Sequence, residues 1–152
     1  MTYPMRCHII RDMQRVVLDT CVLASAMRSR HGASFRCIQL VAERRLVALV
    51  TTALFIEYED VLLRPEQQLA HRLPPAVVEA VLAELAALCE PVDTHFRWRP
   101  QLSDPADEMV IDAAINGRAD ALVTHNIGDF RRAAARFALP VLRPRELLER
   151  IR

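Results

Sequence analysis

The sequence contains only three glycines, and their positions exclude the common nucleotide-binding loops. Gly32, Gly117 and Gly128 are too far apart to form either the GxGxxG turn of dinucleotide-binding proteins or the GxxxxGK phosphate loop. None of the serines lies in a GxSxG motif, so the usual signature of a serine hydrolase is also missing. Dinucleotide binding and acyl transfer therefore have no support in this chain.

Cysteines are few, and their spacing does not indicate a metal or disulfide site. The chain has four of them: Cys7, Cys21, Cys37 and Cys89. They form no CxxC pair and have no histidine at ligand spacing, which argues against a zinc site and a disulfide framework. The sequence also lacks any run approaching the roughly 18 to 20 apolar residues that cross a bilayer. We therefore expect a cytoplasmic protein that does not enter the membrane.

Lysine is absent, and all 20 basic residues are arginine. Together with 19 acidic residues they give a formal net charge of +1. This balance gives no information about partners. With 152 residues and 52% hydrophobic content, the chain fits one globular domain with a sizeable core. We expect that domain over residues 13–152, after a poorly ordered N-terminal extension over residues 1–12. Met13 is a candidate natural start.

Apolar strand-like runs alternate with helical patterns along the chain. The strand-like runs lie at residues 15–19, 46–51, 121–125 and, more briefly, 138–144. Helical spacing of apolar residues covers 21–28, 34–45, 52–64, 75–89, 105–116 and 144–151. The prolines between 64 and 75 indicate a helix-to-helix connection. This order predicts an α/β fold with three α/β/α layers and a central, mainly parallel sheet.

Polar residues directly follow two of the predicted strands, where open parallel sheets bind their ligands. Asp19 follows the first strand, and Asn126 and Asp129 follow the strand at 121–125. Asp19 has an alternative role as the N-cap of the next helix, and the sequence leaves both roles open.

Glu57 is expected on the inner side of its helix. It lies at the edge of an apolar stripe formed by Leu54, Tyr58, Val61 and Leu62. At 100° per residue, a carboxylate in this position faces inward. The alternative is a salt-bridged or snorkelling acid at the helix margin.

The helix at 105–116 is expected to begin with Asp104 as its N-cap and proline as its first residue. Asp107 heads an apolar face whose other members are Val110, Ile111 and Ala114. Asp112 lies off that face and is expected in solvent. Asp107 is therefore the acid of this segment that we predict to face the site.

Carboxylates that converge in one cleft repel each other by roughly 4 kcal/mol per pair at 4 Å in an effective dielectric near 20. Such a cluster needs a cation to be stable. Oxygen ligands that leave room for water and phosphate suit Mg²⁺ or Mn²⁺ better than zinc. The placement of the acids thus indicates metal-assisted phosphodiester hydrolysis, provided that they converge.

Three segments of the chain carry a family resemblance: VVLDTCVL, TTALFIEYEDVL and SDPADEMVIDAAINGRADALVTHNIGDF. In this order and spacing they resemble the PIN domain family, specifically the toxin components of toxin–antitoxin pairs, over residues 14–148. The resemblance implies a compact α/β/α domain that binds Mg²⁺ or Mn²⁺ and cleaves RNA. It also implies a small antitoxin protein as partner and a homodimer.

The resemblance assigns metal binding and catalysis residue by residue. The matching acids are Asp19, Glu57, Asp107 and Asp129. Auxiliary residues are Thr20, which matches a residue that supports the first carboxylate in the family, together with Asn126 and Asp104. Asp129 is expected to bind the metal directly or through water.

Two places depart from the family's usual pattern. Many members have an acid where this chain has His125 and Asn126, and the family usually has Asn where this chain has Cys21. A thiol is only a weak hydrogen-bond donor, so Cys21 is not expected to replace the hydrogen bonds of an Asn. His125 has two interpretations: a phosphate contact or general acid, and a strand-end histidine without a role.

The leading hypothesis is a metal-dependent endoribonuclease that acts as a toxin. One alternative is a catalytically weakened PIN domain that serves as a binding or regulatory module. Another is a PIN nuclease outside any toxin–antitoxin pair. A metal-dependent phosphatase on a related sheet has less support, because no second Asp stands at position 21.

Overall fold

The computed structural model of the protein describes residues 14–97 and 102–151. The described strands are β1 (Gln14–Leu18), β2 (Leu46–Val50), β3 (Glu90–Pro91), β4 (Ala121–Val123) and β5 (Val141–Leu142). The helices of the first half are α2 (Thr20–Arg28), α3 (Ala33–Ala42), α4 (Thr52–Leu62), α5 (Pro65–His71) and α6 (Pro75–Leu88). Those of the second half are α7 (Pro105–Asn116), α8 (Ile127–Ala135) and α9 (Pro144–Ile151).

The strands of the described residues form one five-stranded sheet in the order β3-β2-β1-β4-β5. Every strand pair in it is parallel, and β1 pairs with both β2 and β4. The register between β1 and β4 sets Leu18 opposite Val123. The residues that follow these two strands, Asp19 and Thr124, are therefore neighbours at the carboxyl edge of the sheet.

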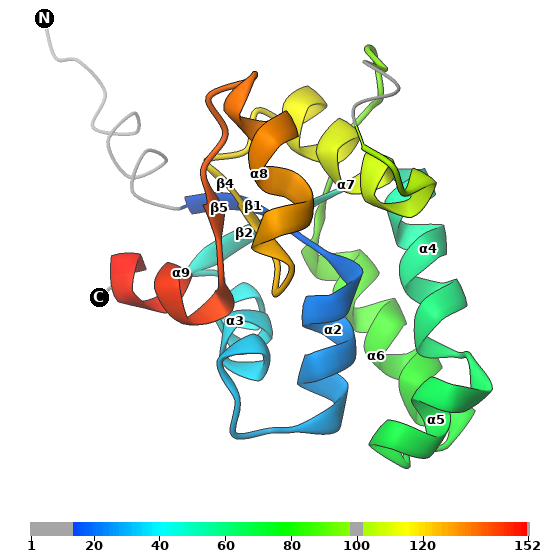
Figure 1. Cartoon of the computed structure of the whole chain (residues 1–152). Coiled ribbons are helices and arrows are strands. Elements are labelled where there is room, and N and C mark those ends of the chain that lie inside the picture. Colours follow the sequence, from blue (N-terminus) through cyan, green and yellow to red (C-terminus); the bar gives the residue numbers. More distant parts are fainter. Residues whose placement is uncertain (1–13, 98–101, 152) are drawn as a thin grey trace, which may run out of the picture.

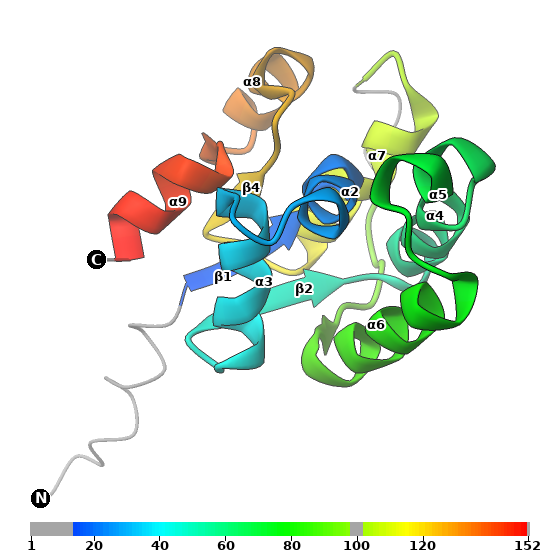
Figure 2. The same ribbon diagram turned by 90° about the horizontal axis from the view of Figure 1, so that it is seen from below.

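Helices cover the sheet on both sides and complete a three-layer α/β/α architecture. α3 packs against one face and α7 against the other, as Figure 1 and, from below, Figure 2 show. α2 packs on α3 and α4, while α9 packs on α3. The central strands are buried on both faces, as expected for apolar runs in a parallel sheet. The predicted fold class is therefore confirmed.

Three elements were not predicted, and each has a physical reason. α5 lies in the expected connection at 64–75; its proline occupies the first turn of the helix, where a missing N–H costs nothing. α8 begins in a stretch rich in turn-forming residues, although Ile127, Phe130 and Ala134 recur at helical spacing and are buried. β3 is only two residues long and pairs only with β2 at the edge of the sheet, where Pro91 is tolerated.

The expected extension over residues 1–12 and the candidate start Met13 lie outside the described residues. In the part of the chain that the structure covers, every helix is too short or too polar to traverse a lipid bilayer.

Candidate active site

Asp19 is held at the carboxyl edge of the sheet by its neighbours on β4. Its backbone N–H donates to the carbonyl of Val123 at 2.9 Å, which continues the β1–β4 ladder by one residue. The side chain is only 5% exposed. Its Oδ2 accepts a 2.7 Å hydrogen bond from Oγ1 of Thr124. Asp19 occupies the N-cap position of α2, as one alternative predicted, but its carboxylate makes no capping hydrogen bond.

Cys21 also donates to Asp19. Its Sγ lies 3.1 Å from the same oxygen, Oδ2. Burial, followed by the charge of Asp19, raises the pKa of the Cys21 thiol to about 11, which keeps it protonated and able to donate at neutral pH. Contrary to the expectation from the sequence, Cys21 therefore does supply a hydrogen bond to the first carboxylate.

The turn between β4 and α8 holds both donor groups, Thr124 and Cys21, through its backbone N–H groups. The backbone N–H of Asn126 donates to Oγ1 of Thr124 at 2.9 Å, and the backbone N–H of His125 donates to Sγ of Cys21 at 3.4 Å. Because each donor group accepts from the backbone, its own proton is available for Asp19. Thr124 was not predicted as a site residue; the signal was its position one residue past a strand that is parallel to β1.

The pKa of the Asp107 carboxyl is raised by its surroundings. It lies in the first turn of α7, half-buried. Burial is the largest cause that raises its pKa to about 6, followed by the charges of four acids: Asp19, Asp104, Asp129 and Glu108. The structure thus brings three predicted ligands, Asp19, Asp107 and Asp129, into one electrostatic group.

Glu57 is connected to this group less directly. It is half-buried on α4, beside the buried side chains of Leu54 and Tyr58. Burial is the main cause that raises the pKa of its carboxyl, with Arg64 opposing the shift and Asp60 and Asp104 adding to it. Asp104 contributes to the raised pKa of both Glu57 and Asp107.

The auxiliary residues occupy defined positions around these acids. Asp104 caps α7 by accepting from the backbone N–H of Ala106 at 2.9 Å, which confirms the predicted N-cap. Asn126 is exposed at the N-cap position of α8, and Asp129 is exposed in the first turn of that helix. Thr20 is buried at the start of α2; within the described chain it is Thr124 that donates to Asp19.

Asp112 corrects one prediction. It is 4% exposed, whereas the sequence placed it in solvent. The reason is that the chain on both sides of the gap at 98–101, between β3 and α7, is held against this side of α7. Oδ1 of Asn116 accepts from the backbone N–H groups of His95 and Phe96, and Oε1 of Glu108 accepts from Leu102 N–H.

His125 has different neighbours from these acids. Its Nε2 is 2.8 Å from Oγ of the buried Ser34 on α3. Burial is the main cause that lowers the pKa of its imidazole; Asp19 opposes the shift, and Arg28 and Arg143 reinforce it. Positive and negative groups thus meet at this end of β4.

The candidate ligands are not preassembled around a metal ion. Among residues 14–97 and 102–151, no three His, Cys, Asp or Glu side chains stand close enough together to enclose an ion. The chemistry of the set nevertheless fits a hard divalent cation, because its members are carboxylates, and their charges add to the effect of burial in raising the pKa of Asp107.

Comparison with known families decides the relationship. The sequence pattern of the PIN domain matches residues 15–128, which include Asp19, Glu57 and Asp107. The chain belongs to the PIN domain family. No curated protein matched this PIN domain.

The fold of this PIN domain is similar to a chain in the crystal structure of VapBC2 from Rickettsia felis bound to a DNA fragment from their promoter. The two chains are 15% identical and superpose with a TM-score of 0.61. The match covers 85% of this chain and 98% of the other. At this identity the similarity establishes a shared fold.

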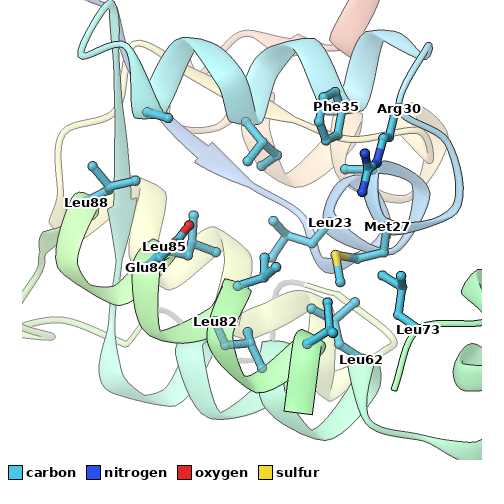
Figure 3. A pocket seen from close by; sticks show the side chains of 15 residues that line it. Leu23, Met27, Arg30, Phe35, Leu62, Leu73, Leu82, Glu84, Leu85 and Leu88 are labelled. Atoms are coloured by element: carbon cyan, nitrogen blue, oxygen red, sulfur yellow. The ribbon is translucent and has the colours of Figure 1, made fainter. Parts of the chain in front are cut away.

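An apolar groove lies apart from the acids, between α2, α3 and α6. Figure 3 shows Leu23 and Met27 of α2, Phe35 of α3 and Leu85 of α6 around it. Arg30 and Glu84 add one charge of each sign. The predicted metal-binding residues do not line this groove.

Proposed function

We propose that this PIN domain is a Mg²⁺- or Mn²⁺-dependent endoribonuclease. The observation that carries the proposal is the grouping of Asp19, Asp104, Asp129 and Glu108 around Asp107, whose pKa is raised first by burial and then by the charges of these four acids. Such crowding is unfavourable for an acid cluster without a cation and is typical of functional sites. Asp19, Glu57, Asp107 and Asp129 would hold the ions. When bound, a divalent cation polarises a phosphate and lowers the pKa of a bound water.

The residues of the chain prepare this chemistry in three ways. Thr124 and Cys21 orient Asp19 through Oδ2. Asp107 must lose its proton before it can bind a cation, and its pKa of about 6 makes this possible at neutral pH. His125, together with Arg28 and Arg143 near it, supplies donors in the neighbourhood of Asp19, and such groups suit an RNA phosphate.

We also propose that the domain is the toxin of a cytoplasmic toxin–antitoxin pair and that it forms a homodimer. The fold shared with a chain of the VapBC2 structure supports a small antitoxin protein as partner. The apolar groove between α2, α3 and α6 suits the apolar face of a partner helix.

A test of the partner uses the protein encoded by a short neighbouring gene, where one exists. Val77 lines the groove and is 42% exposed, whereas Leu69 on α5 is 80% exposed and lies outside it. Binding of that protein should weaken with Val77→Arg and stay unchanged with Leu69→Arg. Equal binding by both variants would exclude the groove.

One observation favours the alternative of a binding or regulatory module. No three candidate ligands in the described part of the chain are preassembled around one point. A nuclease outside any toxin–antitoxin pair is the second alternative, which differs only in lacking the antitoxin.

The experiment that separates nuclease from module is incubation of labelled single-stranded RNA with the purified protein and Mn²⁺ or Mg²⁺. We expect internal cleavage, and a DNA strand of matching sequence should stay intact. Asp107→Asn should abolish cleavage, while Asp93→Asn, a change at an exposed aspartate that does not contribute to the raised pKa of Asp107, should not. Intact RNA with both metals would favour the module.

A further inference from the structure

Cys21 connects two parts of the site that are distant in sequence. It lies in the first turn of α2 and is half-buried. Its Sγ donates to Oδ2 of Asp19 at 3.1 Å and accepts from the backbone N–H of His125 at 3.4 Å. The same sulfur atom therefore contacts the first acid and the turn that leads into α8, which carries Asp129.

Thr124 acts on the same oxygen. Its hydroxyl donates to Oδ2 of Asp19 at 2.7 Å and lies 3.6 Å from Sγ of Cys21. With both donors on Oδ2, the described residues provide no hydrogen-bond donor for Oδ1. The carboxylate is thereby fixed in rotation, with one oxygen restrained and the other available to a ligand.

We propose that Cys21 is a positioning residue, which orients Asp19 for cation binding and ties it to the β4–α8 turn that precedes Asp129. This inference rests on the metal-dependent function proposed above and deepens it. Cys21 itself contacts neither substrate nor cation.

The test compares Cys21→Ala and Cys21→Ser with Cys89→Ala. Cys89 is a suitable control because it is also half-buried and its thiol pKa is also raised to about 11 by burial, but it lies at the end of α6. Calorimetry measures Mn²⁺ affinity, and RNA cleavage gives kcat and KM separately. Outer-shell partners of metal ligands typically contribute about 10-fold or more to affinity or activity.

We expect Cys21→Ala to weaken Mn²⁺ binding and lower kcat by about 10-fold, with KM for RNA unchanged. Cys21→Ser keeps a donor and should restore both values. Cys89→Ala should match the wild type. Equal Mn²⁺ affinity and kcat in Cys21→Ala and the wild type would overturn the proposal, as would equal losses in the Cys21→Ala and Cys89→Ala variants.

A further measurement separates this inference from the proposed function. Hydrogen exchange of the His125 amide reports the contact with Sγ directly, whether or not RNA is cut. Faster exchange in Cys21→Ala but not in Cys21→Ser or Cys89→Ala is expected. If the wild type neither binds Mn²⁺ nor cuts RNA while this exchange pattern holds, the nuclease proposal fails and the tie between Cys21 and the turn stands. Unchanged exchange overturns the tie.

Discussion

Thr124 and Asp19 are 105 residues apart in the chain, and a 2.7 Å hydrogen bond joins Oγ1 of the first to Oδ2 of the second. The bond follows from the parallel register of β1 and β4, which sets Leu18 opposite Val123. Both side chains are buried. The position of the first acid therefore depends on a neighbouring strand as well as on its own.

Replacing Thr124 tests this dependence. Thr124→Val keeps the shape of the side chain but removes the donor, which leaves the buried carboxylate of Asp19 with one hydrogen bond fewer. We expect the free energy of unfolding to fall by about 1–3 kcal/mol and RNA cleavage to fall by about 10-fold or more. Denaturant unfolding and cleavage assays measure the two effects. Thr124→Ser keeps the hydroxyl, and a loss of cleavage as large as that of valine would contradict the account.

The raised pKa of Asp107 predicts a pH dependence of stability. Because its pKa is about 6 in the folded protein and 3.8 in the reference state, the folded state binds more protons between these values. The stabilising contribution is complete below pH 3.8 and is lost as the pH rises through about 6. Asp107→Asn removes the charge that burial and the neighbouring acids disfavour, so at pH 7.5 the variant should be more stable than the wild type.

That difference should shrink as the pH falls below about 6, which unfolding curves at several pH values can follow. Asp93→Asn, at an exposed position, serves as control and should show no such trend. A stability difference for Asp107→Asn that is independent of pH would show that burial and the neighbouring acids do not raise the pKa of this carboxyl.

The sequence was sufficient to predict the features that depend on local spacing. The apolar face of α7, with Val110 and Ile111 buried behind Asp107, follows from helical periodicity. The cap formed by Asp104 follows from its place before a proline. The alternation of apolar strands and helices determines the α/β class.

Features that depend on distant segments could not be predicted in this way. Asp112 is buried because Asn116 holds the backbone of His95 and Phe96 beside α7, a contact between residues 20 and 21 positions apart. The contact between Thr124 and Asp19 depends on the pairing of β4 with β1, and the sequence does not reveal which strands are neighbours. The hydrogen bonds of Cys21 likewise require the position of the β4–α8 turn.

Glu57 can be tested against an acid of the same helix. Glu57 is half-buried and Glu59 is exposed, so only the first is placed to face the site. Glu57→Gln should lower RNA cleavage and weaken Mn²⁺ binding, whereas Glu59→Gln should leave both unchanged. Similar values for the two variants would indicate that Glu57 is a margin acid without a role in metal binding.

Asp112 provides a stability prediction that separates structural from catalytic acids. Because its side chain is 4% exposed, Asp112→Ala should lower the free energy of unfolding by about 1–3 kcal/mol. The exposed Asp93 should tolerate the same change with little effect. Chemical denaturation measures both variants. Cleavage by folded Asp112→Ala should equal that of the wild type, and a specific loss would assign Asp112 to the site.

The most direct test of the central claim is cleavage of labelled RNA by the wild type and by Asp19→Asn in the presence of Mn²⁺. Asp19 is the acid that the fold holds most firmly, through Thr124 and Cys21. The account predicts that the wild type cuts the RNA, that excess EDTA stops the cutting, and that folded Asp19→Asn does not cut. Cutting by Asp19→Asn at the wild-type rate, or cutting that persists in excess EDTA, would contradict it.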